Sequence, residues 1–262
     1  MDWPRFQNAI MLRDSGRPED AMEALLRLET EVNDPDEKAA LMINVHGCYC
    51  DLSRLDEADQ ILTQIRSLDP SPDVRLVVDF GEACMHIQMG QIERGLTEFE
   101  AMLIRDRESL QSAHRDIYED IQRRRGIAFS SLHKAGEALP LLREASSFVA
   151  RAEDKQEVFF YLGICHMQLR ESAIAKDNLL DAVRVGIKNE LDAHARYRLA
   201  LIYSEAGAFA QARLYLEGIL QEYGHDIPNL PNQYICEFLA RTSRELGDEQ
   251  GAEKYEKEAR EQ

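Results

Sequence analysis

The sequence has no paired cysteine motif and no long hydrophobic run. Its five cysteines are odd in number and form no CxxC pair, so a disulfide framework and a zinc ribbon are both disfavoured. No apolar stretch approaches the ~20 residues that span a bilayer. The N-terminal residues Met1 to Arg5 lack the basic start and apolar core of a secretion signal. We therefore predict a cytoplasmic protein with reduced thiols and no membrane partner.

Sequence motifs of catalysis are also missing. The chain has no GxSxG elbow, no glycine-rich phosphate loop, no GxGxxG fingerprint and no HExxH helix. The nearest approach to a metal cluster is His46-x-Cys48-x-Cys50, in which only His46 and Cys50 share a helix face. Zinc takes about four converging ligands, and no further ones can be named. The prediction is a protein without enzymatic activity, cofactor or metal. A phosphate or metal requirement for some activity would revive the enzyme hypothesis.

Positive charge is scarce relative to negative charge. Lys and Arg total 31 against 48 Asp and Glu, which gives a formal net charge of −17. Such a surface repels the phosphates of nucleic acids, so we do not expect nucleic acid to be the main partner. A content of 44% hydrophobic and 30% charged residues over 262 residues is typical of a globular chain that can build a core.

Small residues recur along the chain at a nearly constant spacing. They are Ala21, Ala58, Gly95, Ala138, Ala175, Ala212 and Ala252, at intervals of 37, 37, 43, 37, 37 and 40 residues. In four units a glycine stands five positions earlier, at Gly16, Gly90, Gly207 and Gly247. This self-similarity indicates a repeat architecture.

Each unit has the pattern of two helices joined by a turn. In the sixth unit, apolar residues cluster on one side of 193–205, Ala206-Gly207 breaks the pattern, and Ala212, Leu216 and Ile219 recur at helical spacing. Small residues stand where two helices would cross, because a large side chain there would hold the backbones apart. Gly163 is predicted to lie at such a contact.

These units resemble the tetratricopeptide repeat. The motifs that carry the resemblance are Phe159-x2-Leu162-Gly163-x2-His166, Leu199-Ala200-x2-Tyr203 with Gly207 and Ala212, and Ala58 through Leu68-Asp69-Pro70. The resemblance implies an all-α fold, a right-handed solenoid (superhelix) of about seven antiparallel helix-turn-helix repeats. The period near 37 is longer than the family's usual 34 and implies longer helices or loops. One repeat domain is expected over 1–262, with approximate units 2–35, 39–72, 76–105, 111–152, 156–189, 193–224 and 233–262.

Two intervals depart from the period. The 43-residue step brings a polar run into the fourth unit, where Arg125 stands at a position expected to be leucine, so this unit is predicted to be the least protected. The 40-residue step contains the loop Gly224 to Pro231, whose two prolines prevent a continuous helix.

Two rows of mostly apolar residues recur on the first helix of each unit, and we call them the apolar ladder. The first row is Phe6, Ile43, Phe80, Arg123, Phe160 and Tyr197, and the second is Ile10, Gly47, Cys84, Ile127, Ile164 and Leu201. The adjacent polar row is Asp14, Asp51, Gln88, Gln168, Glu205 and Glu245. The resemblance places the ladder on a ligand-binding groove. The same residues could instead pack against the next repeat, and the sequence leaves both interpretations open.

The resemblance implies a scaffold or adaptor that binds a protein or peptide in its concave groove. An apolar strip beside an acidic one suits a basic or amphipathic partner. A peptide-sensing regulatory module is the alternative, although no DNA-binding segment is left over. Arg123 could anchor a carboxylate, or pair with Glu119 or Asp120 on a solvated helix side. His86 and His166, at the signature's Tyr position, are interpreted as buried and hydrogen-bonded.

Overall fold

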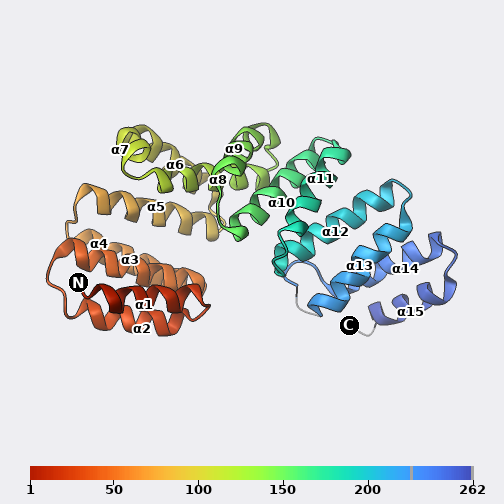
Figure 1. Cartoon of the computed structure of the whole chain (residues 1–262), viewed down its shortest axis with the longest axis horizontal. Coiled ribbons are helices and arrows are strands. Elements are labelled where there is room, and N and C mark those ends of the chain that lie inside the picture. Colours follow the sequence, from red (N-terminus) through yellow and green to blue (C-terminus); the bar gives the residue numbers. More distant parts are fainter. Residues whose placement is uncertain (225–226, 261–262) are drawn as a thin grey trace. The chain divides into compact units, whose positions relative to one another are not determined.

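The structure is a computed structural model that describes residues 1–224 and 227–260. Within these residues the chain forms fifteen α-helices and no strand, which confirms the predicted all-α class (Figure 1). The helices divide into two compact units, Met1–Ile121 and Gln122–Gln262, and the boundary falls inside helix α8 (Arg115–Ser131). In the described part of the chain, no helix has the length and apolar character that crossing a membrane requires.

The first unit consists of consecutive antiparallel helix pairs. They are α1 (Trp3–Asp14) with α2 (Pro18–Glu29), α3 (Pro35–Asp51) with α4 (Leu55–Ser67), and α5 (Pro72–Gln88) with α6 (Ile92–Arg105), followed by the short α7 (Arg107–Ser112). A proline lies in the first turn of α1, α2, α3 and α5, where the missing N–H costs nothing. The short helix α7 lies in the 43-residue step of the sequence. Its residue Leu110 is completely buried and packs this helix against the unit.

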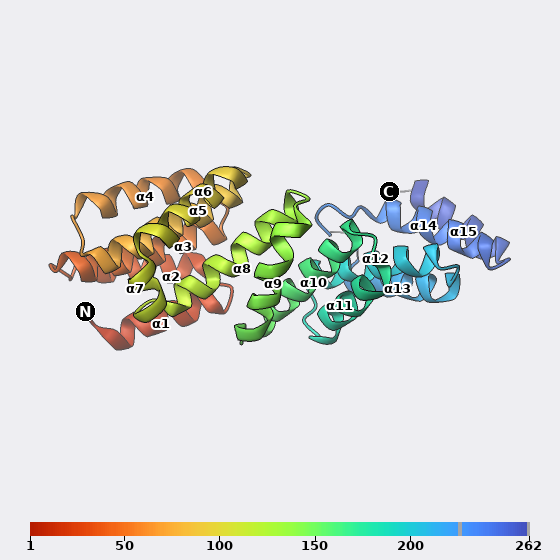
Figure 2. The ribbon, with the colours of Figure 1, turned by 90° about the horizontal axis from the view of Figure 1, so that it is seen from above.

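The second unit continues the same arrangement. It contains the C-terminal part of α8, α9 (Ala135–Phe148), α10 (Ala152–Gln168), α11 (Ser172–Arg184), α12 (Glu190–Glu205), α13 (Phe209–Tyr223), α14 (Asn232–Glu245) and α15 (Glu249–Arg260). Figure 2 shows α12 beside α13 and α14 beside α15, and both pairs are in contact. The loop before α14 is not helical over 227–231, and it buries Ile227 and Leu230. His225 and Asp226 of the predicted two-proline loop lie outside the described residues.

The turns inside the helix pairs share one geometry. Seven turns in the described chain have a residue of positive φ, at Gly16, Ser53, Gly90, His133, Arg170, Gly207 and Gly247. At each, the N–H of the positive-φ residue bonds to the carbonyl three residues earlier, and the next N–H bonds five residues back; Gly207 and Ala208 do so at 3.0 and 2.8 Å. This is the Schellman C-cap, which satisfies the last carbonyls of the first helix and reverses the chain.

Helices of a pair touch at the predicted small residues. A Cβ atom on Gly163 would lie 2.7 Å from Leu179 Cγ, and one on Gly126 would lie 2.9 Å from Leu142 Cγ. Ala138, Ala175 and Ala212 have no exposed surface. The predicted helix contact at Gly163 is therefore confirmed, and its cause is the close approach of α10 and α11.

Candidate binding surface

In the first unit, the apolar ladder is half-buried rather than open. Phe6 and Ile43 pack against the core formed by α1 to α5, and Phe80 stacks on Phe99 of α6 with ring centroids 5.9 Å apart. Cys84 packs against the core that contains Phe99. Ile10 is half-buried, and within the described residues of this unit it does not belong to the side chains that pack on these cores. The ladder of this unit thus contributes to packing and keeps part of its surface accessible.

An arginine lies across this part of the ladder. The guanidinium of Arg13 donates to both carboxylate oxygens of Asp51, at 2.5 Å from Nε and 3.1 Å from Nη2. A Cβ on Gly47 would lie 2.6 Å from Arg13 Cζ, so the glycine leaves the space that the guanidinium occupies. The bond to Asp51 raises the pKa of Arg13. Asp51 of the polar row is therefore paired within the protein's own surface, whereas Asp14 and Gln88 are exposed at the ends of α1 and α5.

In the second unit, two members of the first ladder row are buried. Phe160 is 8% exposed and meets Tyr161 edge to face, and Arg123 is 7% exposed. Arg123 forms ion pairs with Glu157 and, at 3.5 Å, with Asp154. It therefore pairs with carboxylates of α10, an arrangement that neither interpretation from the sequence included. Four further ladder residues are half-buried: Ile127, Ile164, Tyr197 and Leu201.

The polar row of the second unit divides into a bonded and an open part. Gln168 Nε2 donates to the carbonyl oxygen of Ser130 at 2.9 Å, which ties α10 to the end of α8. Glu205 and Glu245 are exposed at the ends of α12 and α14. Glu205 also borders a pocket of the second unit.

Two exposed aromatic residues on the first helices were not predicted. Trp3 is 62% exposed and meets Phe6 edge to face at 5.7 Å, and Tyr234 of α14 is 55% exposed. Both stand at the same repeat position, but that position is not aromatic in the units between them, so the repeat spacing alone would not have found them. Exposed aromatic side chains are common anchors of protein interfaces.

The seam histidines are buried and hydrogen-bonded, as predicted. His86 Nδ1 lies 2.7 Å from Glu98 Oε2, and His166 Nδ1 lies 2.5 Å from Glu171 Oε2. His46 Nε2 lies 3.6 Å from Cys50 Sγ. Burial, and then the charge of Arg13, lower the pKa of His46 to about 4. In the described residues no group of three or more His, Cys, Asp or Glu side chains is arranged to hold a metal ion.

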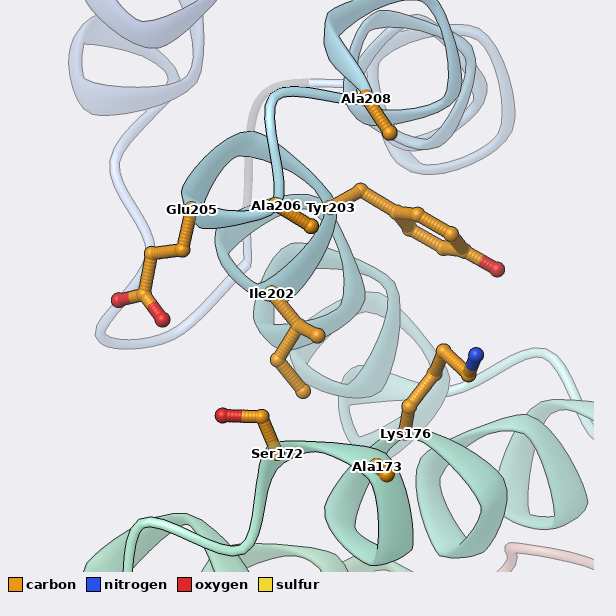
Figure 3. A pocket seen from close by; sticks show the side chains of 8 residues that line it. All are labelled: Ser172, Ala173, Lys176, Ile202, Tyr203, Glu205, Ala206 and Ala208. Carbon is orange, nitrogen blue, oxygen red and sulfur yellow. The ribbon is translucent and has the colours of Figure 1, made fainter.

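A pocket of about 560 Å³ lies between α11 and the end of α12 (Figure 3). It is lined by Ser172, Ala173, Lys176, Ile202, Tyr203, Glu205, Ala206 and Ala208. The lining is mostly apolar, with Lys176 and Glu205 on opposite sides of Ile202. Tyr203 is held by stacking on Tyr215 of α13, with centroids 5.7 Å apart and an interplanar angle of 13°. The repeat spacing of the first helices did not identify Lys176, because this residue belongs to a second helix.

In two other pockets of the described chain, the arginine side chains form ion pairs with glutamates. One of about 450 Å³ between α13 and α15 contains Arg213, which bonds Glu217 at 2.7 Å. Another of about 390 Å³ between α1 and α2 contains Arg5 and Arg27, which pair with Glu31 and Glu23. In the pocket of Figure 3, by contrast, Lys176 and Glu205 have no ion pair or side-chain hydrogen bond within the described residues.

The comparisons with known proteins agree with this architecture. The tetratricopeptide repeat model matches residues 194–225, and no curated protein matches the sequence. PilF of Pseudomonas aeruginosa superposes with a TM-score of 0.65 at 19% identity, covering 84% of this chain and 90% of that chain. A tetratricopeptide repeat protein of Parabacteroides merdae gives 0.57 at 15%, covering 98% and 91%.

A third similar structure is a chain of the APC/C hetero-tetramer Cut9–Hcn1. It gives a TM-score of 0.72 at 13% identity and covers 91% of this chain but 42% of its own length. Identities this low establish the fold alone. The predicted resemblance is confirmed: the chain has the fold of solved tetratricopeptide repeat proteins, and residues 194–225 match the family's sequence model.

Proposed function

We propose that this protein is a non-enzymatic scaffold that binds a protein or peptide on the face of its first helices. The observation that carries the proposal is the recurrence on that face of partly accessible apolar and aromatic side chains at repeat spacing, to which the exposed aromatic residues Trp3 and Tyr234 are added. Half-buried Ile10 belongs to this face in the first unit, and half-buried Ile164 and Leu201 belong to it in the second unit. Apolar surface that stays exposed next to polar rows is typical of interaction sites.

The net charge of −17 favours a basic or amphipathic partner, and nucleic acid is not proposed as a partner. We place this interaction in the cytoplasm. The polar edge of the proposed surface is supplied by Asp14, Gln88, Glu205 and Glu245. The buried members of the ladder, Phe160 and Arg123, belong to the packed framework of the second unit.

The test compares partner capture by Trp3→Ala/Tyr234→Ala with capture by the wild type, using tagged protein and native cell extract. Each truncation of an interface aromatic is expected to weaken binding by about 1–3 kcal/mol. Thermal melting should stay close to that of the wild type, because both side chains are largely exposed.

Leu214→Ala is the matched control. Leu214 is 68% exposed, but it lies on α13, a second helix, and so is not part of the proposed surface. Capture lost in Leu214→Ala and kept in the aromatic double variant would place binding on the second helices and overturn the proposal.

A further inference from the structure

The pocket of Figure 3 differs from the equivalent positions one repeat earlier and later. Leu139 stands 37 residues before Lys176 and is buried, while Arg213 stands 37 residues after it and pairs with Glu217 and Asp248. Gln168 stands 37 residues before Glu205 and bonds to Ser130. Among the described residues of these repeats, two opposite charges thus stand unpaired across one pocket.

The walls of this pocket are apolar and held in place. Ile202 is buried in the contact with α11, and the alanines at 173, 206 and 208 are too small to fill the space above it. The Schellman turn at Gly207 holds the end of α12, since Ala208 N–H bonds to Tyr203 O at 2.8 Å. A volume of about 560 Å³ accommodates an apolar side chain with its flanking backbone.

We infer that this pocket docks an extended segment of a partner protein that presents an apolar side chain between one acidic and one basic residue. The apolar side chain covers Ile202, the acidic group faces Lys176, and the basic group faces Glu205. The inference deepens the proposed scaffold function and rests on it for the identity of the partner as a protein.

The requirement for both charges follows from the arrangement of the pocket. Lys176 is half-buried and Glu205 borders the opposite side, so a segment of one charge sign would face one like charge. Side chains two residues apart share one face of an extended chain. The matching pattern therefore has the apolar residue in the middle and the charged residues two positions away on each side.

The probes are two synthetic peptides, acetyl-Asp-Gly-Leu-Gly-Lys-amide and its reverse, acetyl-Lys-Gly-Leu-Gly-Asp-amide. Binding is followed by the δ1-methyl resonance of Ile202 in the full chain, up to about 10 mM peptide. One order is expected to bind better than the other, because the pocket has a positive and a negative side. Replacing the leucine by serine should abolish the shift.

The decisive variant exchanges the two charges, as Lys176→Glu/Glu205→Lys. It should reverse the preference between the two peptides, and Lys176→Gln or Glu205→Gln alone should weaken the preferred peptide about three- to fivefold. Within the described chain neither residue has an ion-pair partner to lose, so melting should not change. An unshifted Ile202 methyl with every peptide, or a preference that the exchange does not reverse, would overturn the inference.

The scaffold proposal is tested separately by Trp3→Ala/Tyr234→Ala, which should leave the peptide titration unchanged. If peptides bind at Ile202 but partner capture does not change in Trp3→Ala/Tyr234→Ala, docking at the pocket stands and the proposed first-helix binding surface is wrong. If partner capture depends on the two aromatic residues but no peptide shifts the Ile202 methyl resonance, the scaffold proposal stands and the proposed docking at the pocket is wrong.

Discussion

His46 is a buried histidine that the protein keeps neutral. Burial and the nearby Arg13 lower its pKa from 6.5 to about 4, although Asp51, Asp59 and Glu82 oppose the shift. The unfolded chain binds this proton below about pH 6.5, whereas the folded chain does so only near pH 4. The contribution of His46 to the free energy of unfolding should therefore be constant above about pH 6.5. It should fall as the pH drops from about 6.5 to about 4.

The pH prediction is checked with His46→Gln, which removes the titrating ring. Between pH 7 and pH 5 the wild type should lose about 2 kcal/mol more stability than this variant. Urea unfolding at the two pH values measures the difference. His133→Gln changes an exposed histidine and should keep the wild-type slope; the same slope in all three proteins would contradict the assignment.

Gly163 and Gly136 allow one substitution to be compared in two surroundings. A Cβ at Gly163 would lie 2.7 and 2.8 Å from Leu179 atoms, so Gly163→Ala should cost about 1–3 kcal/mol by overpacking. A Cβ at Gly136 of α9 would meet nothing within 4 Å, so Gly136→Ala should be neutral or stabilise by up to about 1 kcal/mol. Equal unfolding free energies in urea would mean that α10 and α11 approach less closely.

At the residue scale, the helix seams were predictable from the sequence and the ion-pair partners were not. The contact at Gly163 was predictable because a small residue at helix-crossing spacing indicates that two backbones come close. The partner of Arg123 was not predictable, since Glu157 lies 34 residues away, on the next first helix. Pairing of this kind depends on where long side chains point, which periodicity does not encode.

At the scale of the element, the turn inside each pair is the constant feature. Four turns have glycine with φ between +73° and +78°, and three have Ser53, His133 and Arg170 with φ of 57°, 58° and 61°. The left-handed conformation costs an L-residue roughly 1–2 kcal/mol, which glycine avoids. The chain thus keeps the turn geometry even where its residue is unfavourable.

Replacing one of these residues by glycine should stabilise the protein. Arg170→Gly is expected to raise the free energy of unfolding by about 0.5–1 kcal/mol, after the greater freedom of glycine in the unfolded chain is subtracted. The reverse change, Gly207→Ala, should lower it by about 1 kcal/mol. Thermal melting of the two variants measures both effects, and destabilisation by Arg170→Gly would show that its side chain has a stabilising role.

The helix pairs themselves were predictable from the spacing of small residues, whereas α7 was not. The residues 107–112 are mostly polar and lie in the 43-residue step, where the sequence predicts no helix of their own, yet they form a short helix with Leu110 fully buried. A single apolar residue in a polar segment carries no periodic signal. Tertiary packing, rather than local pattern, decides such an element.

At the scale of the whole molecule, the contacts between helices join close neighbours in the chain. In the second unit α10 contacts α9, α11 and α12, and α13 contacts α12 and α14. Stability in such an array is approximately a sum of repeat and nearest-neighbour terms. A local defect should therefore spread only a short way along the chain.

Gly163→Ala tests this through hydrogen exchange followed by mass spectrometry. Forcing α10 and α11 apart should speed exchange in α9 to α12, because these helices depend directly on the α10–α11 contact. Helices α1 to α4 belong to the first compact unit and should exchange as in the wild type. Equal acceleration in both compact units would mean that the chain unfolds as one cooperative body, and the nearest-neighbour description would then be wrong for this protein.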